Sequence, residues 1–175
     1  MSEINSALGI KIIEKAFIAD LRDKAKKLKE RKSTNAKCAL FVENWIHKNF
    51  DSEGKLATGG GWQPLSEMTL KLRIKGKGQR NPKILHDRGW LRNKWKRYYT
   101  DEDAIVESGV DYGEIHEHGG WITLKINPKY HRGKNAPPAG THKIKIPQRK
   151  ILPTKDKIWP KIQEIYKKFL NEILK

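Results

Sequence analysis

The sequence predicts an α+β protein with N-terminal helices, a small and mainly antiparallel sheet with extended loops, and a C-terminal helix. Two observations support this fold class. Apolar residues recur at steps of three and four over residues 10–50, and again over residues 162–173, which is typical of amphipathic helices. Between these segments the pattern changes to the two-residue alternation of half-buried strands.

The first two helices are indicated by apolar stripes. One helix is predicted from Ile10 to about Arg31, and a second runs to about Phe50, with Ser33 or Thr34 suited to accept hydrogen bonds from its free amides. We expect these helices to pack as a hairpin. The stripes consist of Ile13, Phe17, Leu21, Ala25 and Leu28 in the first helix and of Cys38, Phe41, Val42 and Trp45 in the second.

The middle of the chain predicts two more helices, at residues 66–74 and 84–97, although Gly89 costs the latter about 1 kcal/mol relative to Ala. Strands are predicted at residues 104–108, 122–126 and 143–146. A final helix follows Pro147, with Pro160 in its first turn, where no backbone donor is needed. Its apolar face carries Ile162, Ile165, Phe169 and Ile173.

The length of 175 residues corresponds to a single domain, residues 1–175, with enough chain to bury a useful core. Glycine and proline are concentrated at residues 51–61, 75–83 and 128–142, where we predict flexible loops. No stretch approaches the roughly 20 apolar residues of a membrane span, and no secretory signal is visible. We therefore expect no membrane partner and synthesis in the cytosol.

The net charge of +17 attracts nucleic acid or acidic protein surfaces. The lysines are spread along the whole chain, so a solvated surface is an equal alternative. Residues 92–99 interleave cations with aromatic rings, a pattern that single-stranded nucleic acid can use, and the possible contacts are Arg92, Lys94, Lys96 and Arg97. The alternative favoured here is a helix end that runs into a strand, with Trp95 and Tyr98 packed inward.

No catalytic, cofactor or metal site is predicted. His116 and His118 would share one face of a strand but diverge by about 200° on a helix. A metal-dependent hydrolase remains a weak alternative, because the possible further ligands Glu114, Glu117, His131 and His142 have no recognised spacing. Residues 76–80 lack the phosphate-binding pattern of a P-loop, and Cys38 lies in an apolar helix, where a thiolate is not favoured.

Four short blocks follow one another in the second half of the chain. The first block is Trp62-Gln63-Pro64-Leu65-Ser66 followed by Thr69, the second is Ile84-Leu85-His86-Asp87-Arg88-Gly89 followed by Leu91, the third is Tyr112-Gly113-Glu114-Ile115-His116-Glu117-His118-Gly119, and the fourth is Ile146-Pro147-Gln148-Arg149-Lys150-Ile151-Leu152. Each block alone is a weak signal. Their order and spacing together are the stronger observation.

In this order the blocks resemble the phage virion morphogenesis family, the tail-completion proteins of Mu-like and related contractile-tailed phages. The corresponding family patterns are Trp-x-Pro-Leu-Ser, Ile-Leu-x-x-Thr-Gly-x-Leu, Tyr-Ala-x-Ile-His-x-Phe-Gly and Ile-Pro-Ala-Arg-x-Phe-Leu. This chain departs from them at Arg88, Gly113, His118, Gln148 and Ile151.

The resemblance implies a non-enzymatic structural subunit that completes the tail or joins head to tail, as a ring of identical copies. Its implied partners are further copies of itself, tail-tube or terminator proteins and head-tail connector proteins, and genomic DNA in the lumen is a further candidate. Its implied location is the tail or neck of the virion, and the bacterial host cytoplasm during assembly.

The implied motif and assembly residues are Trp62, Pro64, Leu65, Leu85, Gly89, Leu91, Tyr112, Ile115, His116, Gly119, Pro147 and Arg149. Within the third block, which is expected to turn the chain between strands, Ile115 should be buried. His116 should be structurally constrained and His118 tolerant. Arg149 is expected to bind a carboxylate, in the same subunit or in the next one, through both arms of its guanidinium.

Overall fold

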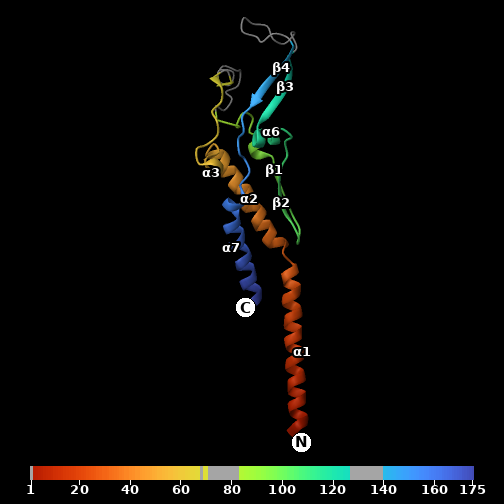
Figure 1. Cartoon of the computed structure of the whole chain (residues 1–175). Coiled ribbons are helices and arrows are strands. Elements are labelled where there is room, and N and C mark those ends of the chain that lie inside the picture. The colour runs from red at the N-terminus through yellow and green to blue at the C-terminus, as the bar shows by residue number, and fades with distance from the viewer. Residues whose placement is uncertain (1, 68, 71–82, 127–139) are drawn as a thin grey trace. The chain divides into compact units, whose positions relative to one another are not determined.

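The computed structural model describes residues 2–67, 69–70, 83–126 and 140–175. Its helices are α1 (Ser2–Lys29), α2 (Lys32–Asp51), α3 (Lys55–Thr58), α5 (Trp90–Asn93), α6 (Gly113–His118) and α7 (Lys155–Leu174). Its strands are β1 (Trp95–Tyr99), β2 (Ala104–Ser108), β3 (Gly120–Ile126) and β4 (Gly140–Ile146). The N-terminal helices, the two small antiparallel sheets and the C-terminal helix confirm the α+β class (Figure 1).

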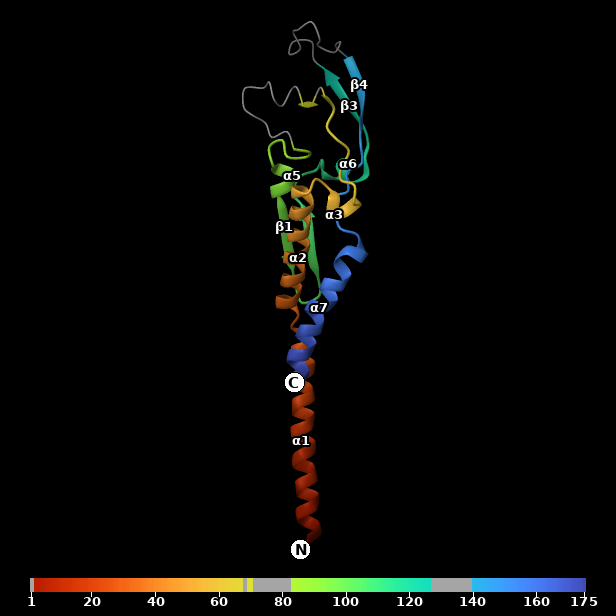
Figure 2. The same ribbon diagram turned by 90° about the vertical axis from the view of Figure 1, so that its left-hand side faces the viewer.

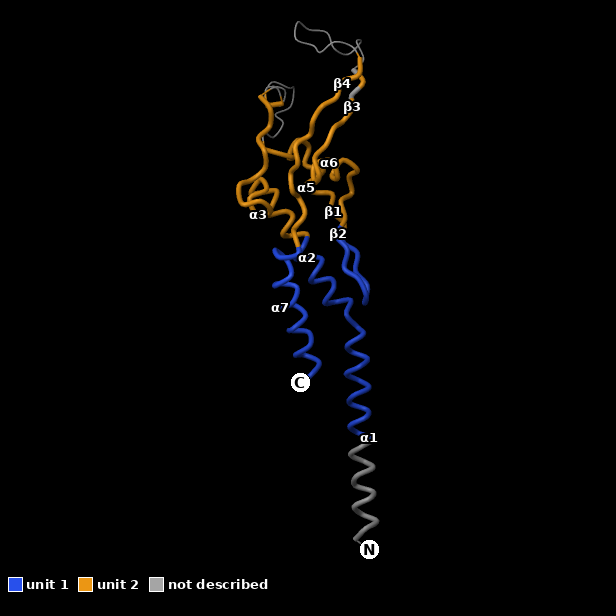
Figure 3. Tube along the Cα trace, in the orientation of Figure 1, with its two compact units in different colours: residues 1–42, 97–106, 155–175 blue, residues 43–96, 107–154 orange. Residues whose placement is uncertain are grey.

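The chain divides into two compact units, which Figure 3 shows in different colours. Unit 1 contains residues 1–42, 97–106 and 155–175, and unit 2 contains residues 43–96 and 107–154. The boundary falls within α2 and within the β1–β2 hairpin, so each unit holds part of both.

In unit 1, the chain continues from α1 into α2 instead of reversing, so the predicted helical hairpin is wrong (Figure 2). The two-residue break is bridged by main-chain hydrogen bonds, from the amide of Glu30 to the carbonyl of Lys27, from that of Arg31 to Lys29 and from that of Asn35 to Arg31. The helix α7 contacts α1. Phe17, Leu21 and Leu28 of the predicted apolar stripe on α1 are exposed.

The start of α2 is held by the turn between β1 and β2. A carboxylate oxygen of Asp101 accepts a hydrogen bond from the amide of Lys32 at 2.8 Å, and the Asp101 carbonyl accepts one from Nε of Arg31 at 3.1 Å. Asp101 therefore satisfies one of the free amides at this helix end. Ser33 and Thr34 do not have the capping position predicted for them, because α2 already begins at Lys32.

The helix α7 is joined to α2 by a buried polar contact. The Tyr166 hydroxyl donates to Oδ1 of Asn35 at 2.5 Å, and Nδ2 of Asn35 donates to the carbonyl of Thr100 at 2.9 Å. Since Asn35 is only 2% exposed, these hydrogen bonds compensate the burial of its amide. Pro160 lies in the second turn of α7, not in the first, because the helix begins at Lys155.

Unit 2 is built around the end of α2. Ile46 and Phe50 are fully buried, and the Trp62 ring packs edge-on against Phe50 with centroids 5.2 Å apart. Gly54 has a left-handed φ of 87°, and a Cβ there would lie 2.3 Å from Cδ1 of Trp62. Residues 51–61, for which we predicted a flexible loop, thus contain α3 and this close contact.

The strands predicted at residues 104–108, 122–126 and 143–146 are confirmed within β2, β3 and β4. The helix predicted at residues 84–97 is wrong, since only Trp90–Asn93 is helical and β1 begins at Trp95. Leu85, with φ 59°, and Gly89, with φ 74°, are left-handed, and an α-helix cannot continue through such residues.

Several predicted segments lie wholly or partly outside the described residues. Residues 67, 69 and 70 are helical, as predicted for 66–74, and the Ser66 hydroxyl accepts a hydrogen bond from the amide of Thr69 at 3.2 Å. The rest of that helix, most of the predicted loop 75–83, and residues 128–139 of the predicted loop 128–142 are outside the described part of the chain. Residues 140–142 belong to β4.

Candidate functional site

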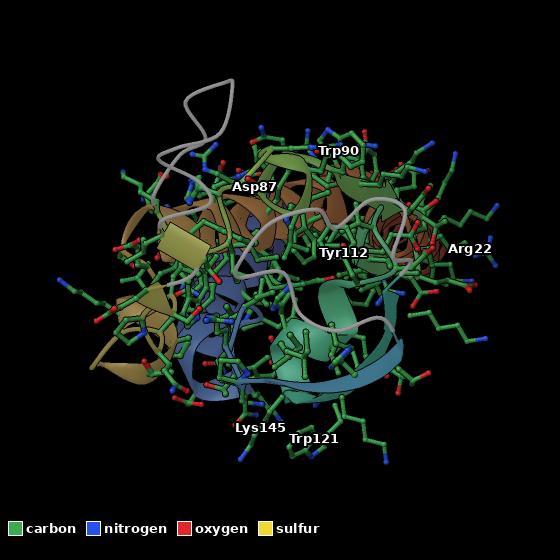
Figure 4. The ribbon with its side chains drawn as sticks, turned by 90° about the horizontal axis from the view of Figure 1, so that it is seen from above. Arg22, Asp87, Trp90, Tyr112, Trp121 and Lys145 are labelled. Carbon is green, nitrogen blue, oxygen red and sulfur yellow. The ribbon has the colours of Figure 1, made fainter. Side chains whose placement is uncertain are left out.

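All four sequence blocks meet at one cleft of about 670 Å³ in unit 2. In Figure 4, Tyr112 of the third block lies between Asp87 and Trp90 of the second-block segment and the β3–β4 ribbon. The lining residues are Gln63, Pro64, Leu65, Ser66, Thr69, Leu85, Asp87, Arg88, Gly89, Trp90, Leu91, Tyr112, His116, Ile144, Lys145, Ile146, Pro147 and Arg149. Of the motif residues expected from the sequence, nine line the cleft, and Trp62, Ile115 and Gly119 do not.

The first block is fastened to the fourth by side-chain hydrogen bonds. Nε1 of the buried Trp62 donates to the carbonyl of Lys150 at 2.8 Å. Nε and Nη2 of Arg149 donate to the carbonyl of Gln63 at 3.3 and 3.2 Å. The guanidinium of Arg149 thus binds a main-chain carbonyl, and at 6% exposure it forms a fixed part of the cleft wall, while its expected contact with a carboxylate stays a prediction.

Asn49, at the end of α2, holds the fourth block from the other side. Its Nδ2 donates to the carbonyls of Lys150 at 3.0 Å and Ile151 at 3.1 Å, while its Oδ1 accepts a hydrogen bond from the amide of Ala57 at 3.1 Å. Asn49 is fully buried, so each of these hydrogen bonds replaces one that water makes in the unfolded chain. Sequence reasoning missed this residue.

The third block forms the helix α6 between β2 and β3. Residues two apart on a helix point in directions about 200° apart, so His116 and His118 diverge. His116 is half-buried and lines the cleft, whereas His118 is exposed. Ile115, expected to be buried, is half-buried.

The imidazole of His116 is kept neutral by its surroundings. Its ring packs edge-on against Tyr112, with centroids 6.2 Å apart. Burial, together with the positive charge of Arg149, lowers the pKa of His116 to about 4. Near neutral pH the side chain is therefore an uncharged aromatic group in the cleft wall.

Glu117 links α6 to the fourth block and is a second residue that sequence reasoning missed, since we considered it only as a possible metal ligand. Its Oε2 accepts hydrogen bonds from the amides of Ile151 at 2.5 Å and Leu152 at 3.0 Å. Its Oε1 lies 3.5 Å from Nζ of Lys150. At 8% exposure, this carboxylate has both main-chain donors and a cation to compensate its burial.

Gly119 ends α6 in a conformation that favours glycine, with φ 71° and ψ 174°. A Cβ at this position would lie 2.8 Å from the main-chain nitrogen of Gln148. Directly beside this contact, the amide of Arg149 donates to the carbonyl of His116 at 2.6 Å. The third and fourth blocks are thus in backbone contact, which requires a residue without a side chain.

The four cations proposed for nucleic acid are only partly available. Arg92 forms an ion pair with Asp51 at 2.8 Å, and Nζ of Lys94 lies 4.5 Å from the centre of the Trp90 ring. Lys96 and Arg97 are exposed on β1. The adjoining Tyr98 is 48% exposed, so the prediction that it packs inward is wrong, whereas Trp95 is half-buried.

Other candidate chemistry finds little support among the residues that the structure describes. No group of three His, Cys, Asp or Glu side chains is gathered there as a metal site. Cys38 is buried, and this burial raises the pKa of its thiol. The glycine-containing segment 76–80 lies outside the described residues. None of the described helices has the length and apolar character needed to cross a membrane.

Comparison with curated proteins and with solved structures gave no significant match. The model of the phage virion morphogenesis family, by contrast, matches residues 15–171. This range contains all four blocks, the cleft that they line, the elements from α2 to β4 and most of α7. The chain therefore belongs to the phage virion morphogenesis family.

Proposed function

We propose that the protein is a non-enzymatic structural subunit that completes the tail or joins head to tail, as one copy in a ring of identical copies. The observation that carries this proposal is the convergence of the four blocks on one cleft. If a neighbouring subunit recognises this cleft, all four segments are needed to shape it, although they lie far apart in the chain.

The walls of the cleft combine fixed polar groups with exposed apolar side chains. Arg149, Glu117 and Asn49 are buried and hydrogen-bonded, so they hold the backbone of the walls in place. Trp90 is 47% exposed, Tyr112 45% and Ile144 41%. Exposed aromatic and aliphatic side chains on a rigid, concave surface are typical of protein-protein contact sites.

A second surface with exposed apolar side chains lies on α1. Its exposed apolar residues follow the helical spacing of three and four and consist of Phe17 at 61%, Ile18 at 42%, Leu21 at 49% and Leu28 at 37% exposure. An isolated helix gains most of its stability from packing its apolar stripe, so a partner for this surface is expected. A heterologous contact joins two different surfaces of identical copies, and such contacts can close a ring.

In this role the protein would contact further copies of itself, tail-tube or terminator proteins, and head-tail connector proteins. It would reside in the tail or neck of the virion after assembly in the host cytoplasm. The family supports a role in virion morphogenesis, and the finer assignment to the head-tail region rests on the sequence blocks and the cleft.

Electron microscopy of particles made by a phage that lacks this protein tests the proposal. We expect separate filled heads and unattached tails, with infectivity restored by the wild-type protein supplied in trans. Normal numbers of joined, infectious particles without the protein would overturn the proposed function.

The cleft can be tested with a matched pair of variants. Ile144→Glu places a charge in the cleft, while Ile105→Glu makes the same change on β2, where the isoleucine is 50% exposed outside the cleft lining. Both proteins should fold, because both side chains are exposed. We expect only Ile144→Glu to fail in complementation, and equal complementation by both variants would contradict the role of the cleft.

A further inference from the structure

The β3–β4 ribbon has two chemically different faces. In the antiparallel register, Trp121 lies opposite Lys145, Thr123 opposite Lys143 and Lys125 opposite Thr141. Side chains alternate between the faces of a strand, and directly opposed residues share a face. These six residues therefore form one face, here called the outer face, although Lys145 also contributes to the cleft lining. Of the alternate residues, Ile144 and Ile146 line the cleft.

The outer face combines three lysines with one exposed aromatic ring and contains no carboxylate. Trp121 is 65% exposed, and Lys125, Lys143 and Lys145 are all exposed. Figure 4 shows Trp121 and Lys145 beside each other on the outer side of the ribbon, directed away from Tyr112. In the described part of the chain, no carboxylate forms an ion pair with any of these three lysines.

We infer that the outer face binds single-stranded DNA, with the three lysines on backbone phosphates and a base stacked on Trp121. Lysine ammonium groups neutralise phosphates, and an exposed ring between them offers a platform for a base. An indole exposed to this degree is costly in water, which argues against a merely solvated basic face. The inference is independent of the proposed role in tail assembly.

Two of the cations near β1 are less available than the lysines of the outer face. Arg92 is already paired with Asp51, and Lys94 already lies over the Trp90 ring. An acidic protein surface could also be attracted by lysines, but a carboxylate cannot stack on Trp121. The contribution of Trp121 therefore distinguishes DNA from an acidic protein.

The test measures binding of the full-length protein to a fluorescent single-stranded oligonucleotide by anisotropy, over a range of salt concentrations. Lys143→Gln/Lys145→Gln removes two cations from the outer face. Lys37→Gln/Lys48→Gln is the matched control, because it removes two exposed lysines of α2 and changes the net charge equally. Trp121→Ala removes the stacking platform, and circular dichroism confirms that each variant is folded.

For a single strand, each lost phosphate contact reduces the slope of log affinity against log salt by about 0.7, so the double variant should lose about 1.4. When the salt concentration rises from 50 to 200 mM, the wild-type protein should therefore lose roughly sevenfold more of its affinity for the oligonucleotide than Lys143→Gln/Lys145→Gln loses. The control should keep the wild-type slope. Trp121→Ala should weaken binding roughly 5- to 150-fold, which corresponds to about 1–3 kcal/mol for stacking of one base.

Three results of the binding measurements would overturn the inference, and one result of a competition experiment would do the same. These are no binding by the wild-type protein at low salt, equal slopes for the two double variants, and wild-type affinity of Trp121→Ala. Polyglutamate serves as the probe for an acidic protein, and competition by polyglutamate as strong as that by unlabelled oligonucleotide would also overturn it.

Discussion

The hydrogen bonds of Glu117 predict a large and specific loss of stability when its carboxylate is removed. Glu117→Ala leaves the amides of Ile151 and Leu152 without their acceptor. An unsatisfied buried donor costs about 1–3 kcal/mol. Ile151 is 2% exposed and Leu152 is 43% exposed, so water can replace the acceptor more readily for Leu152.

The expected loss for Glu117→Ala is therefore roughly 2–4 kcal/mol in the free energy of unfolding. The pair with Lys150 adds little, since an exposed ion pair contributes about 0–1 kcal/mol and the Lys150 side chain is 40% exposed. Glu117→Gln keeps an acceptor oxygen but loses the charge that strengthens the hydrogen bonds. It should cost only about 1 kcal/mol.

Urea denaturation followed by circular dichroism measures these differences. Glu114→Ala is the control, because Glu114 is exposed on the same helix and its replacement should change stability by no more than about 0.5 kcal/mol. If Glu117→Ala were as stable as Glu114→Ala, or if Glu117→Gln lost as much as Glu117→Ala, Glu117 would not hold α6 to the fourth block as described.

Three further predictions concern other parts of unit 2. The pKa of His116 is lowered from 6.5 to about 4 in the folded protein, so the unfolded chain binds its proton first as the pH falls. Stability should decrease from about pH 6.5 to about pH 4 by at most about 3 kcal/mol, and His116→Gln should remove this decrease in pH-dependent denaturation while His118→Gln retains it. Gly119→Ala should destabilise the protein by roughly 2 kcal/mol more than Gly59→Ala. Both glycines have positive φ, but of the two only Gly119 has a main-chain atom within 3 Å of an added Cβ. Equal melting temperatures of the two variants would contradict this prediction. Asn49→Leu should lower the free energy of unfolding by about 3 kcal/mol or more, because three hydrogen bonds are lost. Asn44→Leu, at an exposed position of α2, should be nearly neutral. Similar urea midpoints for the two variants would refute the account of Asn49.

Local patterns predicted those elements whose conformation depends on local periodicity. The alternation of residues 104–108 and 122–126 identified β2 and β3, because one side of each strand is more apolar than the other. The helical spacing likewise identified α1, α2 and α7, with errors of position at their starts. Asp101, which binds the first amide of α2, is 69 residues away from it, so no local pattern could predict that helix start.

The helix predicted at residues 84–97, the region of α5 and β1, was wrong for a different reason. Leu85 is left-handed, with φ 59°, although leucine is a good helix former. In β1, four of five residues are exposed, so the strand has no buried face that would produce an alternating pattern. The cations and aromatic rings of Trp95–Tyr99 consequently fitted a helix end as well as they fitted a strand.

The candidate site was partly visible in the sequence through the order of its blocks, but its geometry was not. Trp62 and Lys150 are 88 residues apart, and only the folded chain brings the first block to the fourth. Glu117 and Asn49 were missed because their partners are main-chain amides and carbonyls, which every segment has. Such partners leave no residue-specific signal in one sequence.

The most direct test of the tail-assembly role is complementation in vitro with extracts of a phage that lacks this protein. Such extracts contain heads and tails that we expect to remain separate. Adding the purified wild-type protein should produce joined, infectious particles, and Ile144→Glu should produce far fewer than Ile105→Glu. No gain in infectious particles with the wild-type protein, in extracts where heads and tails are both intact, would contradict the account.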